Sequence, residues 1–394
     1  MYSDFPKVLK DFECLKKDLS SVISATREMI LSNLSMISQI PAFTFEEKKR
    51  SEFILEKFAE AGIPDPSTDI MYNALGKIEN SKTAKTILIT AHMDNPFDEA
   101  IDQNISIREN KVFGMDMAED NLALAALTTL PDILARSKMQ IKSNLSLLAT
   151  TRSHGKGDFE GMRYYLNNLD KKPDCVIHLS GITFGKIDYF TLSRVRCDIK
   201  SKFNIPSEMA WVRSTHDSAI VVINEVINAI LSIPLPRQPK SVINLGMING
   251  GERYSTVSRE ASINIEFLSE KDNITDSVIT QINDYCMDIG ARHGVEVRAN
   301  FFGRHHAAGI NCSHPLIKVS IEIIKSLGFE PIIEYSCSEI TVPLSMGIPT
   351  VSIGVATGTG GKTPEAYINT ETIEKGILQL LALIYMIDNG CCSE

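Results

Sequence analysis

Short apolar runs alternate with helical patterns along most of this chain, and this alternation restricts the fold more than any other feature of the sequence. The run from Thr86 to Ala91 is almost continuously apolar, as expected for a strand that helices cover on both faces. Similar runs lie at 145–149, 175–179, 331–333 and 350–353, with helical patterns at 46–61, 122–137, 160–169, 315–327 and 372–387. The alternation predicts a layered α/β domain with a mainly parallel central sheet. Two further helical patterns, 6–19 and 21–37, precede it.

The middle of the chain follows a different order. From about Ser193 the patterns are strand 195–203, helix 215–231, strands 241–248 and 260–268, helix 275–293 and strand 294–302. A β-α-β-β-α-β order is the ferredoxin-like pattern. Because 394 residues exceed what one hydrophobic core usually supports, two domains are expected. We predict an inserted ferredoxin-like α+β domain at 194–307 and a discontinuous α/β domain at 1–193 and 308–394.

Composition narrows the classes of function. A formal net charge of -9 disfavours nucleic-acid binding, which requires a basic face. The longest apolar runs are too short to span a bilayer, and the N-terminal segment lacks the apolar stretch of a secretory signal. The cysteines are scattered without a C-x-x-C pair, which is typical of reduced, buried thiols. We therefore expect a cytoplasmic location and neither a membrane nor a nucleic acid as partner.

A histidine and an acid follow the strand at 86–91 directly, as His92 and Asp94. In open α/β sheets, binding sites form at the carboxyl ends of the strands. A neutral imidazole binds zinc well, and a nearby carboxylate can orient it. This position is therefore where a metal ligand would lie.

Further motifs follow in a recognisable order. They are an acidic pair before a small-residue helix (VFGMDMAEDNLALAA, 112–126), a glycine turn (INGG, 248–251), and a late strand with the segment GKTPEAYI (346–354 and 361–368). In this order the chain resembles the peptidase T, aminoacylase and carboxypeptidase G superfamily of two-domain zinc exopeptidases. The resemblance implies a zinc-exopeptidase-like fold with an inserted lid or dimerisation domain. It also implies hydrolysis of a peptide or amide bond, with a small peptide or an N-acyl or amide small molecule as substrate.

The resemblance also assigns roles to single residues. His92 fits the first zinc ligand. Asp94 fits the carboxylate that supports this ligand, and we include it among the catalytic residues. Glu119 stands at the position of the bridging aspartate, and a register shift of one residue would give that role to Asp120. His216 lies close to the position of the family's substrate-binding histidine, although a surface residue at a helix start is the simpler interpretation.

Several other positions depart from the family pattern. Ser153 occupies the general-base position, where a serine cannot act as a carboxylate base, and His154 follows it at a ligand position. Ser180 replaces a ligand aspartate, with His178 nearby on the same strand. Lys362 replaces a ligand histidine, and a protonated ammonium does not bind zinc. Ser153 beside His154 is a poor nucleophile and base, because sequence neighbours seldom reach the required geometry.

These substitutions make the site more positive by about four formal charges, which is what two divalent cations would supply. We therefore expect the zinc pair to be absent, with Lys362 partly compensating the acids Asp94, Glu119, Asp120 and Glu339. One alternative keeps a single zinc or other divalent metal, held by His92, Glu119 or Asp120, and His154 or His178. The chain is thus a metallo-exopeptidase or amidohydrolase homologue, or else an inactive binding or assembly protein on the same fold. A homodimer through the inserted domain is implied by the resemblance alone.

Overall fold

The computed structural model describes residues 5–95, 105–114, 120–203, 218–254, 256–360 and 366–392. The chain divides into two compact units, one formed by Met1–Phe190 with Gly309–Glu394 and the other by Thr191–Ala308. Strands β9 (Phe190–Thr191) and β14 (Ala308–Gly309) pair where the chain passes between the units. The first unit holds all the described candidate site residues discussed below.

An eight-stranded sheet forms the centre of the first unit, in the order β1-β2-β6-β3-β7-β16-β8-β15. Its strands are β1 (Ser67–Thr68), β2 (Ala74–Ile78), β3 (Thr86–His92), β6 (Asn144–Thr150), β7 (Cys175–Ser180), β8 (Lys186–Asp188), β15 (Ile332–Ile333) and β16 (Thr350–Gly354). The four inner strands β6, β3, β7 and β16 are parallel, whereas β1, β2 and β8 add antiparallel pairs. The predicted α/β class and mainly parallel sheet are therefore confirmed.

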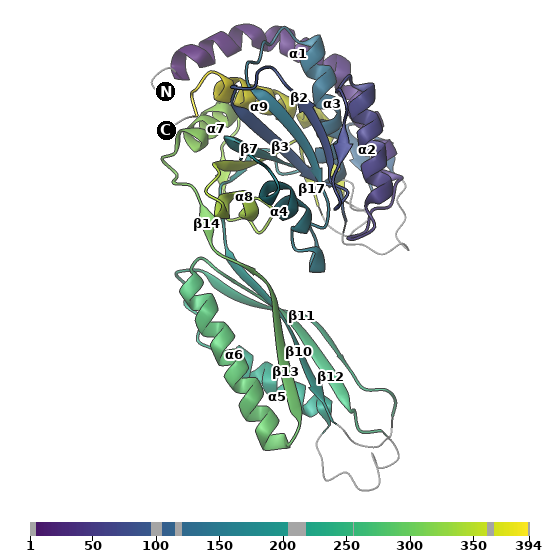
Figure 1. Ribbon diagram of the computed structural model, residues 1–394, viewed down its shortest axis with the longest axis vertical. Coiled ribbons are helices and arrows are strands. Elements are labelled where there is room, and N and C mark those ends of the chain that lie inside the picture. The colour runs from purple at the N-terminus through teal and green to yellow at the C-terminus, as the bar shows by residue number, and fades with distance from the viewer. Residues whose placement is uncertain are drawn as a thin grey trace. The chain divides into compact units, whose positions relative to one another are not determined.

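Helices cover both faces of this sheet (Figure 1). Their bounds are α1 (Phe5–Ser38), α2 (Lys48–Glu60), α3 (Leu122–Arg136), α4 (Glu160–Asn167), α7 (Pro315–Ser326), α8 (Thr341–Ser345) and α9 (Ile373–Asp388). Apolar side chains of α1, α2, α3, α7 and α9 pack on one face, beside Ile87 and Ile89 of β3. Those of α4 and α8 pack on the other face, beside Leu88. Neighbouring residues of one strand thus enter opposite cores, which explains its continuous apolar run.

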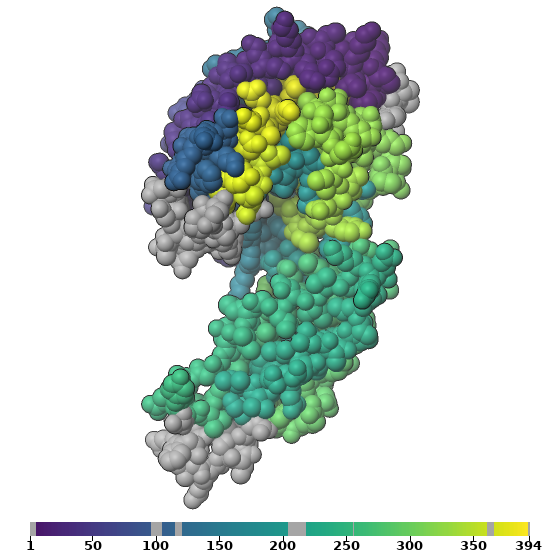
Figure 2. Space-filling view, turned by 180° about the vertical axis from the view of Figure 1, so that it is seen from behind, coloured from purple at the N-terminus to yellow at the C-terminus, as the bar shows by residue number. Residues whose placement is uncertain are grey.

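The N-terminal segment forms one helix, and the prediction of two helices is wrong. Nothing between the two predicted segments breaks a helix, since Ser20 and Ser21 can both be helical. The buried side chains of α1 continue at helical spacing across that point, from Leu19 to Ile23 and onward to Ile30. The helix packs against α3 and α9 and covers one side of the first unit (Figure 2).

A smaller four-stranded sheet lies beside the central one, in the order β17-β18-β5-β4. Its strands are β4 (Ser106–Arg108), β5 (Lys111–Phe113), β17 (Thr357–Thr359) and β18 (Tyr367–Asn369). The pairing of β5 with β18 brings the segment before α3 next to the segment before α9. Two short 3-10 helices, Gly155–Gly157 and Thr370–Thr372, complete the first unit.

The second unit is an antiparallel sheet of order β11-β12-β10-β13 with two helices. Its elements are β10 (Ser193–Lys202), α5 (Ala219–Leu231), β11 (Ser241–Gly250), β12 (Glu260–Ser269), α6 (Asp272–His293) and β13 (Glu296–His305). Both helices pack on one face of the sheet (Figure 1). This order of elements is the split β-α-β pattern. Across both units, a search of the described residues finds no helix long and apolar enough to cross a membrane.

Candidate metal centre

The strand register places the site at the carboxyl edge of the central sheet. β3 runs parallel to β6, with His92 opposite Thr150, and parallel to β7, with Thr90 opposite His178. Each strand therefore delivers its last residues, and the loop that follows, to the same edge. The turn 152–154 consequently lies next to His92, although about 60 residues separate them in sequence.

Three side chains converge at this edge. Nε2 of His92 lies 2.9 Å from Oδ1 of Asp120, and Nε2 of His154 lies 3.6 Å from Oδ2 of the same carboxylate. Within the described part of the chain, this is the group of His, Cys, Asp and Glu residues whose ligand atoms all lie within 4.8 Å of one another. Two imidazoles and a carboxylate match the donor set of a catalytic zinc site, which keeps a further position open.

The ring nitrogens in this group are arranged as metal ligands require. Nδ1 of His92 lies 3.2 Å from the carbonyl oxygen of Asp94, and because a carbonyl only accepts, this nitrogen carries the hydrogen. Nε2 is then the nitrogen turned toward Asp120. Nε2 of His154 is buried and has no hydrogen-bond partner among the described residues. An imidazole nitrogen without a hydrogen-bond partner, beside a carboxylate, is suited to bind a cation.

The charges of the group also shift the pKa values of His92 and Asp120. Burial alone would lower the pKa of His92, but the carboxylates of Asp120, Asp94 and Glu339 raise it to about 10. Burial opposes ionisation of Asp120, yet the two histidines hold the pKa of its carboxyl well below the usual range. A carboxylate buried this deeply is stabilised by positive charge, which a proton on His92 supplies here and a metal ion would supply in its place.

Asp94 has a different role from the one predicted. Its carboxylate lies 3.9 Å from Nδ1 of His92, too far for a hydrogen bond. Instead it accepts hydrogen bonds of 2.9 Å from the backbone N–H groups of Ser153 and His154, and one of 2.8 Å from Thr44. Asp94 therefore supports His92 through its backbone carbonyl and fixes the turn that carries His154.

A fully buried arginine contacts the residues next to His92 and Asp120 in sequence, Met93 and Asn121. Arg50 of α2 donates from Nη1 to the carbonyl oxygen of Met93 at 2.6 Å and to Oδ1 of Asn121 at 3.0 Å. Its guanidinium also donates to the carbonyl oxygen of Ile40. The rigid fork of donors thus connects α2, the segment after β3 and the start of α3, next to Asp120. Sequence reasoning missed Arg50, because one arginine among the three bases of KKR has no distinguishing pattern.

A second group of buried polar side chains surrounds Glu339, which lies two residues before α8 and is 1% exposed. Its Oε2 accepts hydrogen bonds from Thr150 at 2.7 Å and from Ser153 at 3.1 Å. Its Oε1 lies 3.3 Å from Nδ1 of His178, which is also 3.0 Å from the hydroxyl of Thr90. Burial opposes ionisation of Glu339, but contact with His178 and the charge of His92 hold its pKa below the usual range. A carboxylate therefore reaches Ser153 from a distant part of the chain.

The structure brings together only part of the predicted site. His92, Asp120 and His154 form the cluster, and the ring of His178 stacks 6.4 Å from that of His92 without joining it. Ser180 is the last residue of β7, beside Gly354 of β16. Glu119, His216 and Lys362 lie outside the described residues. Glu339 was predicted only as one of the acids that Lys362 compensates, since a single acid in SCSEITVP carries no motif.

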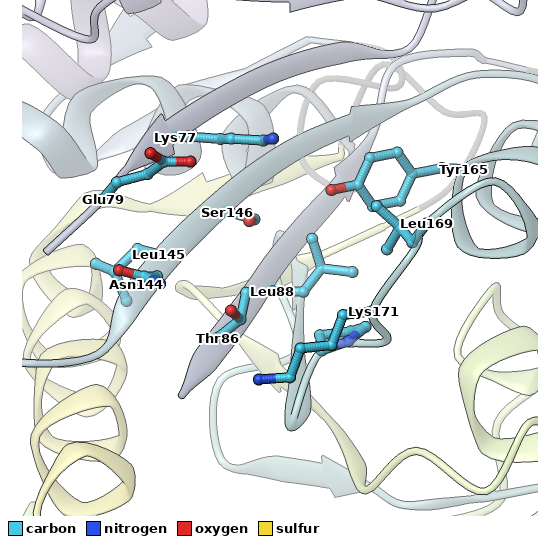
Figure 3. A pocket seen from close by; sticks show the side chains of 11 residues that line it. Lys77, Glu79, Thr86, Leu88, Asn144, Leu145, Ser146, Tyr165, Leu169 and Lys171 are labelled. Carbon is cyan, nitrogen blue, oxygen red and sulfur yellow. The ribbon is translucent and has the colours of Figure 1, made fainter. Parts of the chain in front are cut away.

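A separate cavity of about 140 Å³ lies at the opposite, amino-terminal end of β3 and β6 (Figure 3). It is lined by Thr86 and Asn144, the first residues of these strands, and by Ser146, Tyr165 and Lys171. The hydroxyl of Tyr165 hydrogen-bonds with Ser146, and burial raises the pKa of this tyrosine to about 12. The lining of this cavity includes no histidine or cysteine, unlike the cluster of His92, Asp120 and His154 at the other edge of the sheet.

The structure was compared with known proteins, and several solved structures are similar to it. No family model and no curated protein sequence matches the chain. Among solved structures, aminopeptidase PepT from Bacillus cereus is similar with a TM-score of 0.70 and 16% identity, over 92% of this chain and 98% of that one. The dipeptidase Dug1p from Saccharomyces cerevisiae is similar with a TM-score of 0.78 and 12% identity, over 95% and 99%.

A dinuclear metal-binding peptidase of the M20 family from Bacillus subtilis is also similar, with a TM-score of 0.63 and 13% identity, over 93% of this chain and 99% of that one. At such low identity the likenesses establish the fold. The chain has the fold of the peptidase T-like and M20 peptidases over nearly its whole length, as the sequence motifs predicted.

Proposed function

We propose that this protein is a metal-dependent hydrolase of peptide or amide bonds, of the peptidase T-like type, with one divalent metal held by His92, Asp120 and His154. The observation that carries the proposal is the convergence of these three ligand atoms at the carboxyl edge of a parallel sheet. The fold shared with aminopeptidase PepT, a dipeptidase and an M20 peptidase supports the substrate class.

The donor set favours zinc. Imidazole nitrogen with one carboxylate oxygen suits zinc better than calcium or magnesium, which prefer oxygen ligands. A metal bound here would polarise the scissile carbonyl and acidify a water molecule. Asp94 orients both histidines. Its backbone carbonyl fixes the tautomer of His92, and its carboxylate holds the turn that carries His154. Both imidazoles are thus aimed before a metal arrives.

The proposal also includes a small peptide or N-acyl amino acid as substrate, a cytoplasmic location and a homodimer. Pairing through residues 194–307 is supported by exposed apolar side chains of the edge strand β11, among them Val242, Met247 and Ile248. Light scattering of the purified protein tests the dimer, with twice the mass of 43.6 kDa expected.

Activity measurements test the main proposal. The full-length protein, loaded with one equivalent of Zn²⁺, is assayed against Ala-Ala, Ala-Ala-Ala and N-acetylalanine by amine release. We expect hydrolysis of at least one, and a loss of more than about 10²-fold in His92→Ala, together with its bound zinc. His306→Ala is the matched control, because this histidine is 70% exposed and lies in the second unit. Wild-type protein without turnover, or His92→Ala as active as wild type, would refute the proposal.

A further inference from the structure

Ser153 stands at the position that the resemblance assigns to the general base, and its hydroxyl does not point into solvent. Its hydroxyl donates to Oε2 of Glu339 at 3.1 Å, while Ser153 itself is 6% exposed. Its backbone N–H is fixed by the same Asp94 carboxylate that fixes His154. Ser153 is therefore held between a buried carboxylate and the turn that carries a proposed metal ligand.

We propose that Ser153 and Glu339 together replace the missing general base, with Ser153 taking the proton of the attacking water and passing its own proton to Glu339. The inference rests on the proposed function, because it assigns a proton route to that hydrolysis. Ser153 touches the water and is the catalytic residue of the pair, whereas Glu339 acts through it as a positioning residue.

The hydrogen-bond geometry supports this direction of transfer. A carboxylate accepts only, so the Ser153 O–H is committed to Glu339 and the lone pairs of Oγ remain for another donor. Oε2 of Glu339 also accepts the hydroxyl of Thr150 at 2.7 Å, which keeps the carboxylate oriented toward β6. Glu339 is the more deeply buried of the two, at 1% exposure against 6% for Ser153, so the serine is placed on the outer side of the pair.

Glu339 is also connected to the metal cluster through its buried neighbours. Its other oxygen faces Nδ1 of His178 at 3.3 Å, and the ring of His178 stacks against His92. A carboxylate in a buried polar network of this kind has few alternative side-chain conformations, because its hydrogen-bond partners are themselves held by neighbours.

The proposed step balances as follows. One O–H bond of the water breaks as a bond from its proton to Ser153 Oγ forms, and the Ser153 O–H bond breaks as Glu339 becomes protonated. The electron pair left on the water oxygen forms the new bond to the carbonyl carbon of the substrate. The proton returns along the same route to the leaving nitrogen when the C–N bond breaks, which yields a carboxylic acid and an amine, and the acid then gives its remaining proton to the amine. Ser153 and Glu339 then have their initial protonation states.

Three variants of the zinc-loaded, full-length protein test the relay, with kcat and KM measured on whichever of the three test substrates the wild type hydrolyses. Glu339→Gln keeps the shape of the side chain but removes its acceptor charge, and Ser153→Ala removes the relay while leaving Glu339 in place. We expect each to lower kcat by about 10²-fold or more with little change in KM. The double variant Glu339→Gln with Ser153→Glu places a carboxylate at the base position itself, and should recover at least tenfold of the lost kcat.

Controls separate this role from a structural one. Zinc content and the urea midpoint of unfolding are measured for each variant, and both should stay close to wild type in Ser153→Ala. Asp188→Asn is the matched control for Glu339→Gln, because Asp188 is also buried, at 8% exposure, but pairs with Lys186. It should leave kcat unchanged.

The outcomes distinguish the two proposals. A wild type that hydrolyses none of the substrates refutes the proposed hydrolase and the relay with it. A wild type that turns over, with Ser153→Ala equally fast, overturns the relay alone. Loss of activity in Glu339→Gln without any recovery in the double variant also overturns it, since the loss would then be structural. Recovery by Ser153→Glu supports it.

Discussion

The site has two halves, and each contains a buried carboxylate with different partners, Asp120 in one and Glu339 in the other. The metal half consists of His92, Asp120 and His154, which lie together at the carboxyl edge of the central sheet and are residue types that bind metals. In the relay half, Thr150, Ser153 and Glu339 form a chain of hydrogen bonds in which the carboxylate comes from the segment before α8. The comparison teaches that a segment far away in sequence can bring a carboxylate to the end of a central strand.

The largest expected difference between the halves is in metal affinity. Asp120→Ala removes a proposed ligand and should weaken Zn²⁺ binding by more than about 10²-fold, beyond the effect typical of supporting residues. Glu339→Gln, in the relay half, should change it by less than about tenfold. Competition titration with a chromogenic zinc chelator measures both. Equal losses in the two variants would mean that the halves form one site.

The next effect concerns the scaffold of the metal half. Arg50→Met should lower the free energy of unfolding by about 3 kcal/mol or more, because the carbonyls of Ile40 and Met93 and the amide oxygen of Asn121 lose a buried donor. Urea denaturation measures the change. Lys48→Met on the same helix is the control, since Lys48 is exposed and should change stability by about 0.5 kcal/mol or less. An Arg50→Met protein as stable as the control would exclude this role.

A smaller effect is expected from the residue that joins the halves. Asp94→Asn keeps the backbone carbonyl that fixes His92 but weakens the anchor of the turn at Ser153 and His154. Zinc affinity should fall about 10- to 100-fold, as for other supporting partners of metal ligands. Thr44→Val removes one hydrogen bond to the same carboxylate and should have a smaller effect. If Thr44→Val weakened zinc binding more than Asp94→Asn, the anchor model would be wrong.

The smallest effect is a pH dependence confined to the metal half. His92 has a pKa of about 10 in the metal-free protein, so it is protonated at pH 7 and zinc must displace that proton. Zinc affinity should therefore rise with pH, by about tenfold per unit below that pKa, with about one proton released per zinc. Calorimetric titration in two buffers of different ionisation enthalpy counts the protons. Zinc affinity that does not change from pH 7 to pH 8 would contradict this assignment.

Much of the fold could be predicted from the sequence because its signals are local. Continuous apolar runs identify β3, β6, β7 and β16, and the helical spacing of apolar residues identifies α3, α7 and α9. Strand β2 was missed because its sequence, ALGKI, is short and includes a glycine and a lysine. The division of α1 was wrong because a polar, Lys-rich stretch and the pattern after it were taken as separate helices, although the buried positions continue across both.

The site could be predicted only where its residues follow strand ends. His92 ends a buried strand, His154 lies in the turn after another, and Asp120 precedes a helix, so sequence order indicates their place. Glu339 and Arg50 act through contacts with residues far away in the chain, and no local pattern reports such contacts. The hydrogen bonds of Asp94 to Ser153 and His154 could not be predicted for the same reason, since they depend on the path of the turn after β6.

Anomalous scattering at the zinc absorption edge tests the central claim most directly. Crystals of the full-length protein, grown without chelator and exposed to Zn²⁺, should show one strong anomalous peak in the first unit, bonded to Nε2 of His92, the carboxylate of Asp120 and Nε2 of His154. No peak at these three side chains, or a pair of zinc ions bridged by a carboxylate, would contradict the account.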